Sequence, residues 1–167
     1  MRLLLRGASE KVASDASFAQ MDLHWKGIAR AGGRGRVLLR AEAGLLGTED
    51  FHDLPSTIRY FAGGAQSVRA YEYQELGPRD SSGEPVGGSK LLFGSAELDY
   101  RLFGQWALAA FYDFGNALQS LSDPLASGAG AGVRWVSPVG MVRLDAAQAL
   151  DDPSHHVQFQ FSLGPDL

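Results

Sequence analysis

Apolar and polar residues alternate with a period of two along most of this chain, and a helical period is hard to find. The clearest run covers residues 90–103, where apolar or aromatic residues alternate with mostly polar or charged ones. A period of two places these sets on opposite faces of a β-strand. We therefore predict an all-β protein of eight antiparallel strands, at about residues 1–8, 17–29, 35–46, 89–102, 105–115, 127–136, 139–149 and 155–164.

Turn residues separate the predicted strands, and the connections between them are of two kinds. Short and long connections alternate along the chain. The short ones lie near residues 30–34, 103–104, 137–138 and 150–154, and the long ones at 9–16, 47–88 and 116–126. This alternation is typical of an antiparallel barrel that has tight turns at one end and extended loops at the other.

The face of the strands that is buried decides between two classes of β-protein. A soluble sandwich buries its apolar face, whereas a membrane barrel presents that face to lipid and keeps its charged face in a wet interior. Alternation alone does not distinguish them. Two details favour the barrel: opposite charges lie well inside strands, as at Glu97, Asp99 and Arg101, and aromatic residues such as Trp106 and Trp135 lie near strand ends, where interfacial girdles form.

Composition narrows the function classes. The chain has 167 residues, which suits one domain, and it has no cysteine, which excludes a disulfide framework, a thiolate nucleophile and a cysteine zinc site. Its formal net charge of −4 gives no electrostatic support for a nucleic-acid partner. No stretch without charged residues reaches the roughly 18 residues of a membrane helix, whereas a membrane strand needs only about 9–11. Met1 to Gly7 is too short for a signal-peptide core, so we expect either no export as written or an N-terminus that lies upstream.

The connection at 47–88 is too long for a simple hairpin, and loops of that length are usually functional. Several motifs lie in it and after it, in this order: Arg59-Tyr60-Phe61-Ala62-Gly63-Gly64, Ser67-Val68-Arg69-Ala70-Tyr71-Glu72-Tyr73, Gly94-Ser95-Ala96-Glu97, Phe111-Tyr112-Asp113-Phe114-Gly115, Gly132-Val133-Arg134-Trp135 with Ser137-Pro138-Val139-Gly140, and Leu163-Gly164-Pro165-Asp166-Leu167. The series resembles the signature of the Omp85 superfamily, bacterial outer-membrane barrels that insert or secrete other proteins. Its last motif resembles the ending of the TamA branch. The resemblance is strong over about residues 58–167 and rests on strand pattern alone before them.

The resemblance implies that the long loop folds into the barrel interior. Its tip, Val68-Arg69-Ala70-Tyr71, would place the Arg69 guanidinium against Glu97, Phe111 and Asp113, and the phase of the alternation agrees, because these three residues share the polar face. The alternative is a solvated loop arginine beside ordinary interior charges. The motif residues Arg59, Phe61, Gly63 and Gly64 would shape the same loop.

Ala70 departs from the family pattern, which has glycine at this position. If that position requires a positive φ, alanine is strained there by about 1–2 kcal/mol. The small residues Ala129-Gly130-Ala131-Gly132 open a predicted strand. They indicate either a close approach by the loop or simple curvature of the sheet.

The resemblance also implies a function without a cofactor, a metal or a catalytic set. It implies a TamA-like assembly factor that helps autotransporter-type barrels fold into the bacterial outer membrane, with the lipid bilayer, a TamB-like periplasmic protein and nascent barrel proteins as partners. Family members carry a signal peptide, periplasmic POTRA domains and a sixteen-stranded barrel. Residues 1–167 resemble the C-terminal part of that barrel domain, without POTRA domains. The alternatives are a two-partner-secretion pore or structural barrel of the same superfamily, and a soluble β-protein.

Two further expectations follow. Eight strands enclose only enough room for side chains, so a chain with such a loop should dimerise, close as a small barrel with the loop expelled, or stay open and aggregate through its edges. His155 and His156 are neighbours that point to opposite faces of a strand, so we expect a solvated turn pair and not a metal site.

Overall fold

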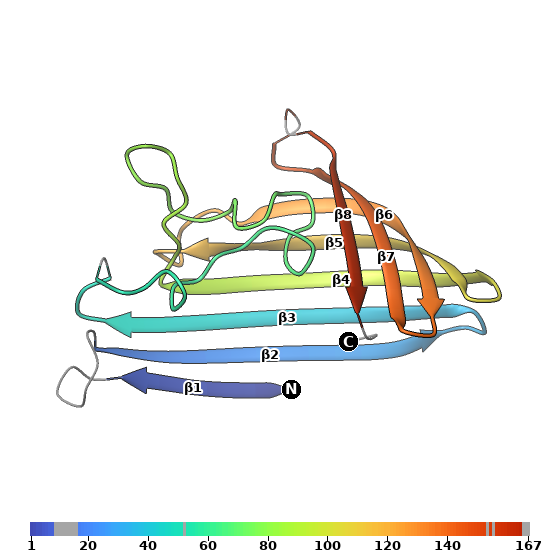
Figure 1. Ribbon diagram of the computed structural model, residues 1–167, viewed down its shortest axis with the longest axis horizontal. Coiled ribbons are helices and arrows are strands. Elements are labelled where there is room, and N and C mark those ends of the chain that lie inside the picture. Colours follow the sequence, from blue (N-terminus) through green and yellow to red (C-terminus); the bar gives the residue numbers. More distant parts are fainter. Residues whose placement is uncertain (9–16, 52, 153, 155, 165–167) are drawn as a thin grey trace.

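The computed structural model describes residues 1–8, 17–51, 53–152, 154 and 156–164. Eight strands form one antiparallel sheet in sequence order (Figure 1). They are β1 (Arg2–Ala8), β2 (Phe18–Ala31), β3 (Gly35–Thr48), β4 (Lys90–Phe103), β5 (Trp106–Leu118), β6 (Ala126–Ser137), β7 (Gly140–Ala149) and β8 (Gln158–Gly164). The predicted all-β antiparallel class is confirmed.

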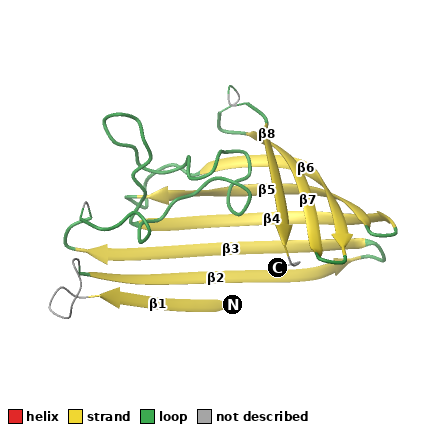
Figure 2. Cartoon of the chain, in the orientation of Figure 1, coloured by secondary structure: helices red, strands yellow, loops and turns green. Residues whose placement is uncertain are grey.

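Strands and loops account for all of the described chain (Figure 2). No described helix is long and apolar enough to cross a membrane. The predicted strand limits agree with the structure to within a few residues. The largest differences, of three residues, lie at the end of β5, which extends to Leu118, and at the start of β8, which begins at Gln158. The predicted connection at 9–16, His52, His155 and the end of the last motif (165–167) lie outside the described residues.

The two faces of the sheet have opposite chemistry. One face, here called the convex face, exposes large apolar side chains such as Leu39, Leu98 and Phe161. The other, the concave face, buries polar and charged side chains: Gln20, Asp22, Ser95, Glu97, Asp99, Asp113, Arg134 and Asp145. This is the arrangement predicted for a membrane barrel and the reverse of a soluble sandwich. Trp106 and Trp135 stack at 5.9 Å near the tight turns, where an interfacial girdle is expected.

The sheet is curved but not closed. Pairing runs from β1 to β8 through consecutive neighbours, and in the described part of the chain no pairing joins β1 to β8. The connection between β3 and β4, here called the long loop (residues 49–89), lies along the concave face (Figure 1). The sheet is not the small closed barrel with an expelled loop, because it is open and retains the loop. Dimerisation and aggregation through the edges stay predictions.

Apolar and polar contacts fix the base of the long loop. Tyr60 donates a hydrogen bond from its hydroxyl to Asp22 Oδ1 on β2 (2.5 Å). Its ring packs in a buried cluster with Leu46, Leu54, Ala62 and Ala117. Burial, and then the hydrogen bond to Asp22, raise the pKa of the Tyr60 hydroxyl above its ordinary value. Tyr60 therefore stays protonated and anchors the loop to the sheet.

The facing of the strands is testable at Leu98, which is 48% exposed on the convex face of β4. Leu98→Arg should lower the free energy of unfolding in lipid vesicles by about 2–4 kcal/mol, because it places a charge against lipid. The matched control is His24→Arg on the concave face, where Glu42 lies 3.5 Å from the ring and would pair with the new charge. Equal losses for the two variants would contradict the assigned faces.

Candidate functional site

The tip of the long loop is shaped by glycines and tight turns. Gly63 and Gly64 have φ values of +104° and +96°, which favour glycine. The amide of Gly64 donates to the carbonyl of Tyr71 (3.1 Å), and the amide of Tyr71 donates to the carbonyl of Val68 (3.2 Å). Arg69 and Ala70 are therefore the central residues of a β-turn, and this turn projects onto the concave face.

Arg59 organises the loop from within. Its guanidinium donates to the carbonyl of Leu54 (2.7 Å from Nη2) and to the carbonyl of Val86 (3.1 Å from Nη1). It also lies over the ring of Phe51, 4.9 Å from its centroid. Phe61 is half-buried and packs so closely beside Gly87 that a side chain at Gly87 would meet its ring. Arg59 and Phe61 thus fold the loop on itself, whereas Tyr60 of the same motif reaches Asp22 on the sheet.

The Arg69 side chain is buried among carboxylates from the sheet. Its Nε and Nη2 donate to the two oxygens of Asp113 at 2.8 and 2.9 Å, a bidentate pair. Its Nη1 donates to Glu97 Oε2 at 2.6 Å. Its Cζ lies 3.4 Å from the ring centroid of Phe111. The structure therefore brings together all four side chains that the sequence associated.

Three more side chains complete this site, and the sequence did not assign them to it. Asp145 on β7 accepts from Arg69 Nη1 (3.3 Å) and from Arg134 Nη1 (2.5 Å). Arg134 on β6 also pairs with Glu97, at 3.0 Å. Ser95 donates to Asp113 Oδ1 at 2.7 Å. We call the set the charge network: Arg69, Ser95, Glu97, Asp113, Arg134 and Asp145.

Both missed charged residues carried a usable signal. Arg134 and Asp145 lie on the polar face by the same alternation that placed Glu97 and Asp113. Their meeting depends on the register of β6 against β7, in which Gly132 faces Asp145. The sequence does not specify that register. The charges could therefore be assigned to the concave face but not to each other.

The network keeps Arg69 charged. Burial alone would lower the pKa of its guanidinium, but the hydrogen bonds and charges of Asp113 and Glu97 outweigh burial and raise this pKa above its ordinary value. A buried charge is stable only when it is paired and hydrogen-bonded. The arrangement is suited to holding a loop in place. Among the described residues, no group of three or more His, Asp or Glu side chains is placed to bind a metal ion.

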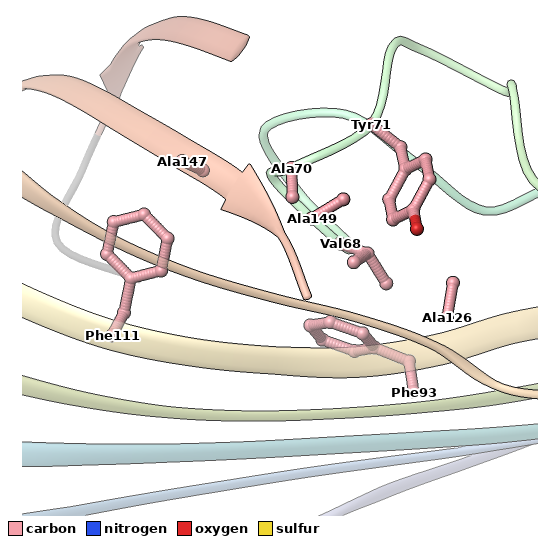
Figure 3. Packing of buried hydrophobic residues seen from close by; sticks show 8 residues of the cluster. All are labelled: Val68, Ala70, Tyr71, Phe93, Phe111, Ala126, Ala147 and Ala149. Atoms are coloured by element: carbon pink, nitrogen blue, oxygen red, sulfur yellow. The ribbon is translucent and has the colours of Figure 1, made fainter. Parts of the chain in front are cut away.

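Apolar contacts surround the charged centre. Figure 3 shows the loop residues Val68, Ala70 and Tyr71 facing residues of the wall. The buried cluster consists of Val68, Ala70, Tyr71, Phe93, Phe111, Ala126, Ala147 and Ala149. Val68 and Ala70 are at most 1% exposed. The loop tip is therefore part of the protein core and not a solvated segment.

Tyr71 and the last strand hold the tip from its outer side. The Tyr71 hydroxyl donates to Asp151 Oδ2 at 2.9 Å. Burial, and then the hydrogen bond to Asp151, raise the pKa of this hydroxyl, so Tyr71 remains a donor. Gln160 on β8 donates from Nε2 to the carbonyls of Arg69 (3.4 Å) and Tyr71 (3.3 Å). The loop tip thus links the centre of the sheet to β8.

Ala70 is not strained, because the positive φ on which that strain would depend is absent. Gln74 is the one described non-glycine residue with a positive φ, so Ala70 takes an ordinary backbone conformation. Its methyl group points at Gly128 on β6, where any side chain would collide with it. Gly130 and Gly132 are instead approached by neighbouring strands and by the charge network. The loop therefore approaches the wall one residue before the predicted run at 129–132.

This fit of alanine against glycine can be tested by exchange. Gly128→Ala should destabilise the folded protein by about 1–3 kcal/mol, because the new methyl group overlaps that of Ala70. Ala70→Gly in the same chain should restore most of the loss, as measured by urea unfolding in vesicles. The control is Gly130→Ala, whose methyl group would meet Phe111 and the β7 backbone. Ala70→Gly should not rescue it, and equal rescue of both variants would contradict the contact.

Comparisons with known proteins agree with this architecture. The Omp85 superfamily domain matches residues 4–166. The outer membrane protein assembly factor BamA of Nitratidesulfovibrio vulgaris is 32% identical over 124 residues, which are 67% of this chain and 16% of that protein. The crystal structure of BamA from Haemophilus ducreyi lacking POTRA domains 1–3 superposes with a TM-score of 0.73 at 18% identity, over 89% of this chain and 35% of that one.

The comparisons assign the chain to a superfamily and not to one branch of it. It spans well under half the length of either relative. Both relatives are BamA proteins, so the resemblance to the TamA branch is not confirmed. The domain match covers nearly the whole chain. The chain therefore belongs to the Omp85 superfamily, and its place is the bacterial outer membrane.

Proposed function

We propose that this chain is the C-terminal part of the barrel of an outer-membrane protein assembly factor. In this proposal, the free edge of β8 pairs with a strand of a client barrel while that client folds into the membrane. The observation that carries the proposal is the edge itself. Membership of the Omp85 superfamily and the likeness to BamA support the client class.

The β8 edge has the features of a template strand. β8 pairs with β7 over seven residue pairs, whereas β2 and β3 share fourteen. Within the described residues its other edge has no partner strand. An unpaired edge presents backbone donors and acceptors that a further strand can use. The function therefore requires neither a cofactor nor a covalent step.

The side chains of β8 match those of a membrane strand. Phe159 and Phe161 are 80% and 64% exposed on the convex face. Gln158, Gln160 and Ser162 alternate with them and face the concave side. A client strand with the same alternation would continue both faces of the sheet. Such strands would be selected because their apolar side chains face the lipid and their polar side chains face the barrel interior.

We further propose that the charge network locks the long loop so that it supports the sheet during this exchange. Arg69 joins β4, β5 and β7 through Glu97, Asp113 and Asp145. These contacts hold three strands at a fixed curvature. The β8 edge is then free to change partner without loss of the interior.

A narrower role stays a separate hypothesis. It assigns the chain to autotransporter-type clients and to a TamB-like periplasmic partner. Its support is the ending at 163–167, of which only Leu163 and Gly164 are described. The client range of the protein decides between the general and the narrow role.

The proposed function is tested with vesicles that contain the folded chain. Unfolded client barrels of two kinds, an autotransporter β-domain and a simple eight-stranded barrel, are added, and folding is followed by heat-modifiable migration on gels. We expect faster folding of both clients than in empty vesicles. Acceleration of the autotransporter client alone would support the narrow role, and no acceleration of either would contradict the proposal.

The site of pairing is tested by cross-linking. The chain has no cysteine, so Ser162→Cys on β8 provides a single reactive thiol. We expect disulfides between this thiol and cysteines placed along a terminal strand of the client. Ala110→Cys, in the middle of β5, is the matched control and should give none. Equal cross-linking of both positions would show that clients do not select the β8 edge.

The lock is tested by a double-mutant cycle that reads protease protection of residues 58–75. Arg69→Ala should weaken docking of the loop by roughly 3–5 kcal/mol, because it leaves buried carboxylates unpaired. Arg69→Lys should restore it only in part, since lysine lacks the planar fork.

The cycle compares the effect of each double variant with the sum of its two single variants, and this comparison shows whether the two residues interact. Arg69→Ala combined with Asp113→Asn should cost less than the sum by about 0.5–3 kcal/mol, because both changes act on one contact. Asp123 lies in an exposed turn, where its carboxylate accepts a hydrogen bond from the Ser120 amide. The effects of Arg69→Ala and Asp123→Asn should therefore be additive. Full additivity of the first pair would contradict the lock.

A further inference from the structure

The tight-turn end of the concave face contains a hollow that lies apart from the contacts of the loop tip. Its volume is about 930 Å³, and it is lined by the turns after β2 and β4 together with the ends of β5, β6 and β7. These turns lie at the right of Figure 1. A hollow of this size lies in the range of ligand-binding pockets, which hold about 300–1,000 Å³.

The charges of this hollow are strongly one-sided. Its described lining contains the five arginines Arg30, Arg34, Arg36, Arg101 and Arg134. One carboxylate, Asp99, lies among them, and it already accepts from Arg36 Nη2 at 2.6 Å. Arg134 belongs to the charge network. Three arginines are left without a carboxylate in the described lining.

Those three arginines, Arg30, Arg34 and Arg101, form what we call the arginine rim. All three are exposed. In the described part of the chain their side chains make no hydrogen bond or ion pair. Like charges gathered without partners repel one another, so such a cluster is stabilised by an anionic ligand.

Two of the three rim arginines lie on the concave face, opposite the exposed apolar side chains of the sheet. Arg30 faces Arg36 across the β2–β3 ladder, and Arg101 follows two residues after Asp99. Both therefore share the concave face with the Arg36–Asp99 pair. Trp106, which stacks on Trp135, lines the same hollow at its edge. A ligand that pairs with Arg30 and Arg101 therefore approaches from the concave side.

The walls between the arginines indicate a polypeptide. Ile28, Val136 and Met141 line the same hollow and give it apolar patches between the charges. A phosphate ion would fill little of the volume and use none of these patches. An extended segment that alternates carboxylates with small apolar side chains would use both. Glu and Asp can each accept two hydrogen bonds from a guanidinium.

We propose that the hollow at the tight-turn end binds an acidic, extended polypeptide segment, held by Arg30, Arg34 and Arg101. This site lies at a different part of the molecule from the β8 edge and does not depend on client assembly. Binding should weaken as salt rises, because exposed charges are screened beyond about 8–10 Å at physiological ionic strength.

The experiment uses the full chain folded in neutral detergent and a decapeptide of alternating Glu and Ala with a neutral fluorophore, followed by fluorescence anisotropy. The triple variant Arg30→Gln/Arg34→Gln/Arg101→Gln should bind the peptide roughly 3- to 150-fold more weakly, since exposed ion pairs each contribute about 1.4- to 5-fold. The single variant Arg34→Gln, at a turn residue, should show only part of the loss of affinity that the triple variant shows. Circular dichroism confirms that each variant is folded.

Matched controls decide the outcome. Arg79→Gln, an exposed arginine in the long loop, should bind the peptide as the parent chain does. The same peptide with Gln for Glu should bind far more weakly. Unchanged binding by the triple variant, or equal binding of the neutral peptide, would overturn the proposal. Displacement of the peptide by millimolar inorganic phosphate, or arginine-dependent binding to phosphatidylglycerol vesicles without peptide binding, would assign the rim to a small anion or to lipid and would also overturn it.

Discussion

A buried guanidinium between carboxylates is the interaction on which the rest of this structure depends. Arg69 is 2% exposed and pairs with Glu97, Asp113 and Asp145 from three different strands. Each of these charges would be costly alone, because removing one partner of a buried pair costs roughly 3–5 kcal/mol. The curvature of the sheet and the position of the loop are therefore coupled. The strands keep the spacing that the guanidinium requires, and the loop stays where its charge is paired.

The wall can accept this loop because it is lined by small residues. Gly128 leaves space for the methyl group of Ala70, and Gly132 leaves space for the pair formed by Asp145 and Arg134. A larger residue at Gly128 would push the loop tip away from the wall, and one at Gly132 would displace the side chains of Asp145 and Arg134. The glycines of β6 thus act together with the charges. The close apolar packing around Val68 and Ala70 excludes water, and this strengthens the ion pairs at the centre of the charge network.

The sequence predicts the faces of the sheet well and the contacts across it less well. A period of two determines which side chains point inward, so Glu97, Phe111 and Asp113 could be assigned to one face. The position of Arg69 against them was inferred from the family resemblance. The pairing of Arg134 with Asp145 depends on strand register, which alternation leaves open. Ala70 is not strained, because the turn at 68–71 has ordinary backbone angles at this residue. The glycine of the family pattern does not show whether its position requires a positive φ.

The attachments of the loop tip differ in strength, and the difference bears on which part of the molecule can move. Toward the sheet centre, the tip is held by charge-assisted hydrogen bonds in a buried network. Toward β8, it is held by two longer bonds from the Gln160 amide. Neutral hydrogen bonds contribute about 0.5–1.5 kcal/mol each, and charged ones about twice that. β8 also has fewer paired residues than β2 to β7. Displacement of β8 therefore costs less than displacement of the loop, so the edge proposed to meet a client can leave the loop tip while the charged contacts of the interior stay in place.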